Sequence, residues 1–166
     1  MPSEKSLTVK NLKVKESKKV PTEVLTGATT LYGEDSSKIF TFGAATNPYT
    51  VTLPSAETGR TVKFIYNATA NANLASNVTL ATKGSDLITG SLVTLDSTSS
   101  TPVNGVVVKN GTSNANVVFL GNVTVSATQA NATPGALVDF VCTTKGLWTV
   151  TGVGYVSYSG GSNIFA

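Results

Sequence analysis

Residues 136–152 read ALVDFVCTTKGLWTVTG, and this stretch decides the fold class. Its first half alternates between two faces, with Val138, Phe140 and Cys142 on one and Leu137, Asp139 and Val141 on the other. Lys145 and Gly146 supply a turn, after which Leu147–Thr151 returns. The pattern predicts a β-hairpin in which Trp148 anchors the core.

Similar runs lie upstream of this hairpin. Arg60–Tyr66 places Val62, Phe64 and Tyr66 on one face, and Tyr49–Leu53 alternates until Pro54, which cannot donate to a sheet, ends it. From residue 27 onward we count about ten such runs between turn residues, and no convincing helix. No clean repeat period relates them, so the sequence gives no ground for predicting a solenoid.

The composition agrees with a β-rich chain. The 166 residues include 26 Thr, 21 Val, 17 Ser and 13 Asn, and only 13% are charged. β-Branched residues fit a pleated surface better than a helix. We therefore predict an all-β fold, an antiparallel β-sandwich or jelly-roll-like body with an extended N-terminal arm.

Charge divides the chain into two parts. Residues 1–26 contain six lysines and three glutamates, whereas residues 27–166 have no net charge, so the arm holds the whole formal charge of +3. We expect a basic extended arm over 1–26 and a single all-β domain over 27–166. A charge asymmetry of this kind suggests that the arm meets an acidic partner.

The arm alternates apolar with polar residues, as a strand does. It has no aromatic ring to stack on a base and no Arg, so nucleic-acid binding is not expected. Docking on a protein is favoured over a merely solvated terminus, by addition to a sheet edge or to another subunit. The residues predicted to bind the partner are Leu7, Val9, Lys10, Leu12, Lys13, Val14 and Lys15.

The residue types leave little room for catalysis. Because the chain has no His, it lacks the Ser-His-Asp triad, the Cys-His pair and the imidazole metal ligand. Cys142 is expected to be a buried structural thiol, and Glu34–Asp35 is not expected to act as an acid/base pair. Asp86, Asp96 and Asp139 are too scattered for a calcium loop. We predict no enzyme activity, no metal and no cofactor.

No apolar run in the sequence has the length of a secretory signal or a membrane span. Synthesis as a soluble cytoplasmic product and no membrane partner are therefore expected.

Two segments together resemble small structural proteins of tailed bacteriophages. These are TVTLPSAETGRTVKFIYNA (residues 50–68) and ALVDFVCTTKGLWTVTG (residues 136–152), and the ending Asn163–Ala166 is similar too. The resemblance implies a virion component that decorates the outer capsid surface, a head decoration or cement protein. Such proteins form homotrimers on the major capsid protein and stiffen the shell.

A second function from another class stays open. The chain could be a tail fibre or spike module that binds carbohydrate or a receptor on the host surface. In that case Tyr32, Tyr49, Tyr155 and Tyr158 would line a sugar-binding face, although packing in the core or an interface is the commoner use of Tyr.

Overall fold

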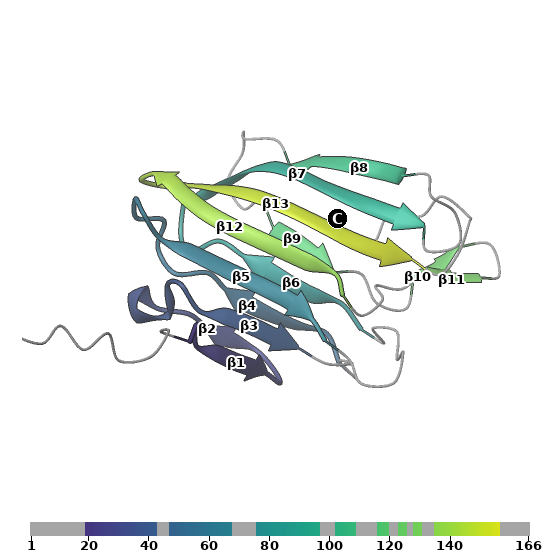
Figure 1. The fold of residues 1–166 in the computed structure, drawn as a ribbon, viewed down its shortest axis with the longest axis horizontal. Coiled ribbons are helices and arrows are strands. Elements are labelled where there is room, and N and C mark those ends of the chain that lie inside the picture. The colour runs from purple at the N-terminus through teal and green to yellow at the C-terminus, as the bar shows by residue number, and fades with distance from the viewer. Residues whose placement is uncertain are drawn as a thin grey trace, which may run out of the picture.

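The computed structural model describes residues 19–42, 47–67, 76–96, 102–108, 116–119, 123–125, 128–130 and 135–156. Strands dominate these residues, and the one helical element is the 3-10 turn η1 (Gly33–Asp35). They form two sheets and a small ribbon (Figure 1). The seven-stranded sheet has the order β1 (Thr22–Leu25), β3 (Ile39–Phe42), β5 (Thr61–Tyr66), β12 (Leu137–Thr144), β13 (Leu147–Val156), β7 (Leu87–Asp96) and β8 (Pro102–Val108). The four-stranded sheet has the order β2 (Thr29–Thr30), β4 (Tyr49–Thr52), β6 (Val78–Ala81) and β9 (Asn116–Phe119), and the ribbon pairs β10 (Val123–Val125) with β11 (Thr128–Ala130).

The first six strands wind as a coil. Consecutive strands alternate between the two sheets, and each of the first four pairs in parallel with the strand two further along the chain. Successive coils begin at Thr22, Ile39 and Thr61, so their lengths differ. The N-terminal half is thus a short two-sided β-solenoid, which the sequence did not predict. Unequal coil lengths leave no fixed period for a sequence to display.

The C-terminal hairpin interrupts this coil. β12 pairs antiparallel with β5 on one side and with β13 on the other, and β13 then pairs in parallel with β7. β7 therefore runs in the same direction as β5, as a next coil would, but two strands lie between them. The hairpin predicted from residues 136–152 joins the solenoid half of the sheet to the β7–β8 pair.

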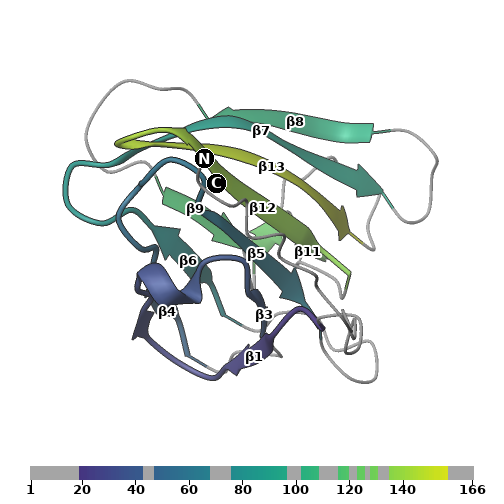
Figure 2. The ribbon, with the colours of Figure 1, turned by 60° about the vertical axis from the view of Figure 1, so that its left-hand side comes forward.

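The two sheets lie as two layers (Figure 2), and buried aromatic side chains belong to the core. Parallel register places Phe40 beside Phe64 and Phe42 beside Tyr66, and both pairs of rings stack with centroids 5.6 and 5.5 Å apart. Phe140 then meets Phe64 and Trp148 edge-on, at 5.9 and 6.2 Å. All of these rings are fully buried, as the sequence predicted for Phe64, Tyr66, Phe140 and Trp148.

The predicted all-β fold is confirmed, and three details differ from expectation. The sheets are mixed and not antiparallel. The sequence could not reveal this, because side chains alternate in the same way in parallel and antiparallel strands. Residues 22–25 of the predicted arm form β1, whose Leu25 belongs to the core. The returning strand, expected over Leu147–Thr151, continues through Gly152 and Gly154 to Val156, and Leu92 and Val138 lie beside Gly152.

Gly90 is a position where only glycine fits. Its φ is +141°, and a Cβ placed there would lie 1.9 Å from the carbonyl oxygen of Val150. Val150 is the residue paired with Gly90 in the β13–β7 register. Glycine thus permits the close parallel approach of β7 to the hairpin.

Candidate interaction face

The residues predicted from the arm, Leu7, Val9, Lys10, Leu12, Lys13, Val14 and Lys15, lie outside the described residues. The described chain begins at Lys19 and runs beside the start of β3, where the Ile39 amide donates to the carbonyl of Pro21 at 3.0 Å. Three exposed residues, Lys19, Val20 and Pro21, therefore lead into β1 along the edge of the seven-stranded sheet.

The solvent side of this sheet, here called the outer face, is unusually rich in apolar residues. Strand alternation turns every second side chain outward, and the register aligns these side chains across neighbouring strands. One aligned row crosses six strands from Val24 to Val93 through Ile65, Leu137 and Val153. Ile39 and Val141 lie on the same face, and Val141 is 38% and Val93 36% exposed.

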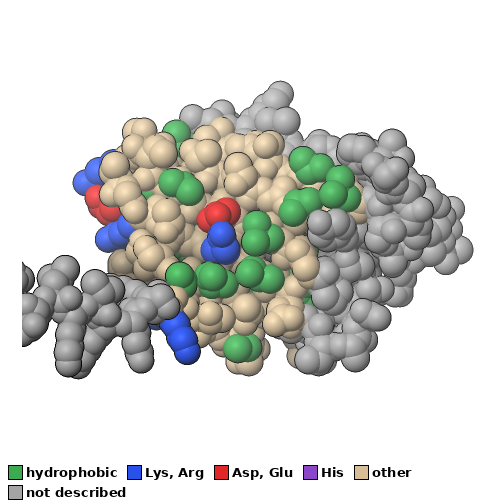
Figure 3. Space-filling view, viewed as in Figure 1, with side chains coloured by type: hydrophobic (Ala, Val, Ile, Leu, Met, Phe, Trp, Pro, Cys, Tyr) green, Lys and Arg blue, Asp and Glu red, His purple; other side chains and the backbone are tan. Residues whose placement is uncertain are grey.

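One ion pair lies among these apolar residues. Lys63 on β5 and Asp139 on β12 are register partners, and their Nζ and Oδ2 atoms are 3.1 Å apart. Both side chains keep about a third of their surface exposed. Figure 3 shows hydrophobic side chains gathered around an acidic and a basic group in the middle of this face. The outer face therefore has apolar area without excess charge.

The opposite side of the sandwich has a different composition. On the outward positions of β2, β4 and β6 stand Thr30, Thr50, Thr52, Thr79 and Ala81. On these three strands none of the described outward residues is a large apolar one, and short hydroxyl side chains favour hydration. The sandwich thus presents an apolar outer face and, over β2, β4 and β6, a threonine-coated back.

Two adjoining hollows open on the outer face near the point where the chain enters. The first, of about 280 Å³, is lined by Val20, Ile39, Lys63, Asp139 and Val141 among others. The second, of about 300 Å³, is lined by Lys19, Val20, Pro21, Glu34 and Ser36. Both include Ser37 and Lys38, so together they form one groove beside the entering chain.

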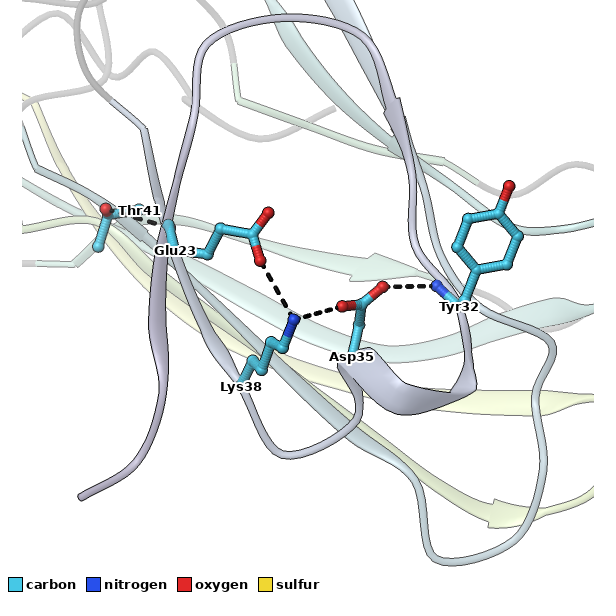
Figure 4. A network of polar contacts seen from close by, with 5 residues as sticks. All are labelled: Glu23, Tyr32, Asp35, Lys38 and Thr41. Carbon is cyan, nitrogen blue, oxygen red and sulfur yellow. Dashed lines mark hydrogen bonds and ion pairs between the residues drawn. The ribbon is translucent and has the colours of Figure 1, made fainter.

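A polar network fixes the first coil beneath this groove (Figure 4). Lys38 Nζ donates to Asp35 Oδ1 at 2.6 Å and to Glu23 Oε2 at 3.2 Å, and the Tyr32 amide donates to Asp35 Oδ2 at 2.7 Å. Burial alone would raise the pKa of Asp35, but the hydrogen bonds from Lys38 and Tyr32 outweigh it and hold that pKa below its usual value. The same bond to Asp35, aided by Glu23, raises the pKa of Lys38. The network joins β1, η1 and the start of β3.

The other residues singled out in the sequence have structural positions. Cys142 is buried, as predicted, and burial raises the pKa of its thiol, which disfavours the nucleophilic thiolate. Asp35 is turned toward Lys38 and Tyr32, whereas Glu34 is exposed on the groove. Among the described residues, no three His, Cys, Asp or Glu side chains gather as a metal site.

The tyrosines do not share a surface character. Tyr32 is 55% exposed with Lys83 Nζ 5.7 Å from its ring centre, while Tyr66 is buried. Tyr49 is half-buried, and desolvation raises its pKa to about 12. The side chains of Tyr155 and Tyr158 lie outside what the structure describes.

Comparisons with protein-family models, with curated proteins and with solved structures found no match for this chain. In the described part of the chain, no helix has the length and apolarity to span a membrane.

The outer face had not been predicted as a site. Its signal was present in the sequence, because the outward residues of two strands, Thr61, Lys63, Ile65 and Leu137, Asp139, Val141, are half apolar. On an ordinary solvated face these positions would be polar throughout.

Proposed function

We propose that this chain is a bacteriophage capsid decoration (cement) protein that binds the outer capsid surface as a homotrimer and stabilises the shell. The observation that carries the proposal is the contrast between the apolar outer face and the threonine-coated back. A protein that docks on a larger assembly needs one surface that loses water readily and another that remains in solvent.

The charges on the outer face support such docking. Depletion of charge at the centre of an interface favours desolvation, and the charges present here, Lys63 and Asp139, neutralise each other. A partner therefore need not leave an unpaired ion buried. The basic N-terminal arm adds a second attachment, to the major capsid protein or to a neighbouring subunit. Several modest contacts per trimer, engaged together, give stable attachment through avidity.

The major capsid protein is the proposed partner, and the virion the proposed location after synthesis in the host cytoplasm. The role requires binding alone, so no cofactor or catalytic group is part of the proposal. It agrees with the resemblance of residues 50–68 and 136–152 to small phage structural proteins.

A capsid-binding assay tests the proposal. Capsids stripped of the protein are incubated with the full chain or with Ile65→Glu, which places a carboxylate in the apolar row of the outer face. We expect the variant to lose at least tenfold in capsid affinity, because an interface would have to bury an unpaired charge. Thr50→Glu, the matched control on the exposed back, should bind as the unmodified chain does.

Equal binding by Ile65→Glu and the full chain would overturn the docking role of the outer face. Absence of the protein from purified virions, counted by quantitative mass spectrometry, would overturn the capsid role itself.

One observation favours the alternative, a fibre or spike module that binds host carbohydrate. Tyr32 presents an exposed ring, and sugar rings stack on such surfaces. A glycan array in which a reproducible signal is lost in Tyr32→Ala, together with no capsid binding, would support the alternative.

A further inference from the structure

The first coil of the solenoid leaves an open edge. Within the described residues β1 pairs on one side only, with β3, and β2 pairs only with β4. Figure 1 shows β1 and β2 at the same border of the sandwich. An edge strand presents backbone N–H and C=O groups that can pair with another strand.

This edge is also where the most exposed apolar side chains gather. Val24 is 67% exposed and Val20 54%, and both lie on or just before β1. Successive side chains of β1 point to opposite faces, and Leu25 is buried in the core. Val24 and Thr22 therefore point to the outer face. Glu23 lies at the intervening position and pairs with Lys38 through one oxygen, Oε2. The edge thus offers an apolar position beside an acidic one.

The arm carries a segment with the complementary pattern. Leu12-Lys13-Val14-Lys15 alternates two apolar residues with two lysines over four residues, the length of β1. Paired beside β1, such a segment would set Val14 against Val24 and would bring a lysine to the side of Glu23. Cross-strand pairs of both kinds stabilise a sheet.

We propose that residues 12–15 of a second copy of this chain add as a strand to the free edge of β1. This interface rests on the homotrimer in the proposed function and specifies how the copies join. Arms that pass from each copy to the next would close a ring, as a heterologous contact with cyclic symmetry does. The β1 edge of each copy in the trimer would then be covered.

The chain's own arm is the competing source of this strand. Pro21 is held beside β3 through its hydrogen bond with Ile39, so an arm that returned along its own β1 would have to reverse within residues 16–20. A three-residue reversal would set Lys10 against Val24, whereas one that used all five residues would set Leu12 there. An arm from another copy takes the matching register without any such reversal, and the trimer of the proposed function supplies that copy.

The test joins two variants that each carry one introduced cysteine besides the buried Cys142. Val14→Cys and Val24→Cys are purified separately, mixed, allowed to exchange subunits and treated with a short bifunctional thiol reagent. We expect a product of twice the 17.0 kDa chain mass that contains one copy of each variant, identified by isotope labelling of one of them. Val14→Cys mixed with Val93→Cys, at the far end of the apolar row, is the matched control and should give several-fold less product. The unmodified chain controls for Cys142, which is buried.

The outcomes separate this interface from the capsid role. Equal cross-linking to Val93→Cys, or no mixed product, would overturn the interface. A monomeric product from the Val14→Cys/Val24→Cys double variant, in the absence of mixed dimers, would also overturn it. Because the assay contains no capsid, either result leaves the capsid-binding test of Ile65→Glu to decide the proposed function separately. Deletion of residues 1–18, which spares β1, should convert the oligomer to monomer in light scattering.

Discussion

The two outer surfaces of the sandwich are built by the same strand alternation and differ in what that alternation exposes. On the four-stranded sheet the outward positions of β4 are threonines, Thr50 and Thr52. On the seven-stranded sheet they include Ile65, Leu137 and Val153 in one aligned row. Apolar residues from the inner faces of both sheets form one buried core, so folding alone does not require apolar residues on one outer surface. The difference points to an interaction at the seven-stranded sheet.

The two surfaces share one core, so the largest expected effect is a loss of stability of the whole fold, on which both surfaces depend. Trp148→Ala should lower the free energy of unfolding by about 3–5 kcal/mol, because it leaves a cavity beside Phe140 and the inner face of β13. Urea unfolding followed by circular dichroism measures this loss, because the substitution removes the single Trp and with it the fluorescence signal.

Trp148→Phe is the companion variant. The Trp148 Nε1–H is buried without an acceptor among the described residues. Removal of this unpaired donor should offset part of the free energy lost through the smaller cavity. The decrease in the free energy of unfolding should therefore be well below that of Trp148→Ala. Equal costs for the two variants would contradict this account of the core.

The next largest effect should destabilise the seven-stranded sheet more than the four-stranded one. Gly90→Ala would drive a Cβ into the Val150 carbonyl, which forces β7 away from β13 within the seven-stranded sheet. We expect a loss of about 3 kcal/mol, together with weaker hydrogen-exchange protection in β7 and β13 than in β4 and β6.

Gly84→Ala is the matched control for Gly90→Ala. Gly84 also has a positive φ, of 61°, but no atom lies within 4 Å of an added Cβ. Its cost should stay at the roughly 1–2 kcal/mol of a left-handed alanine. A similar cost at both positions would show that close approach of the strands is unimportant.

Sequence patterns predicted the inner surfaces well. Burial makes side chains on one face uniformly apolar, so Val62, Phe64 and Tyr66, and the hairpin with Trp148, could be recognised from period-two alternation. Cys142 followed from its place on the same strand face as Phe140.

The parallel coil and the outer face could not be predicted in the same way. Alternation carries no information on strand direction, and the coils that begin at Thr22, Ile39 and Thr61 are unequal in length. The groove joins Val20, Ile39 and Val141, which are distant in sequence and meet only through the sheet order. An apolar residue at an outward position looks like ordinary surface variation until the register aligns it with others.

A smaller effect should appear where the first coil joins the two sheets. Asp35→Asn removes the ion pair with Lys38 and should cost about 1 kcal/mol near neutral pH. Because the pKa of Asp35 lies below its ordinary value of 3.8 in the folded protein, its contribution is present above that value and is lost as pH falls through the lower, folded pKa.

Unfolding curves at several pH values test the Asp35 prediction. The difference in stability between the unmodified chain and Asp35→Asn should be constant above about pH 5 and should shrink below about pH 4. A difference that persists unchanged into acid would show that the carboxylate charge is not what stabilises the coil.

The smallest effect on stability should come from the ion pair within the outer face. Lys63→Met and Asp139→Leu should each change the free energy of unfolding by no more than about 1 kcal/mol, because both side chains remain a third exposed. Their effects on capsid affinity should be larger and non-additive. Each single variant leaves one charge to be buried unpaired against the partner, whereas the double variant leaves none and should regain much of the affinity. Additive losses in the double-mutant cycle would mean that the pair stays in water when the protein is bound, which would move the docking surface away from the middle of this sheet.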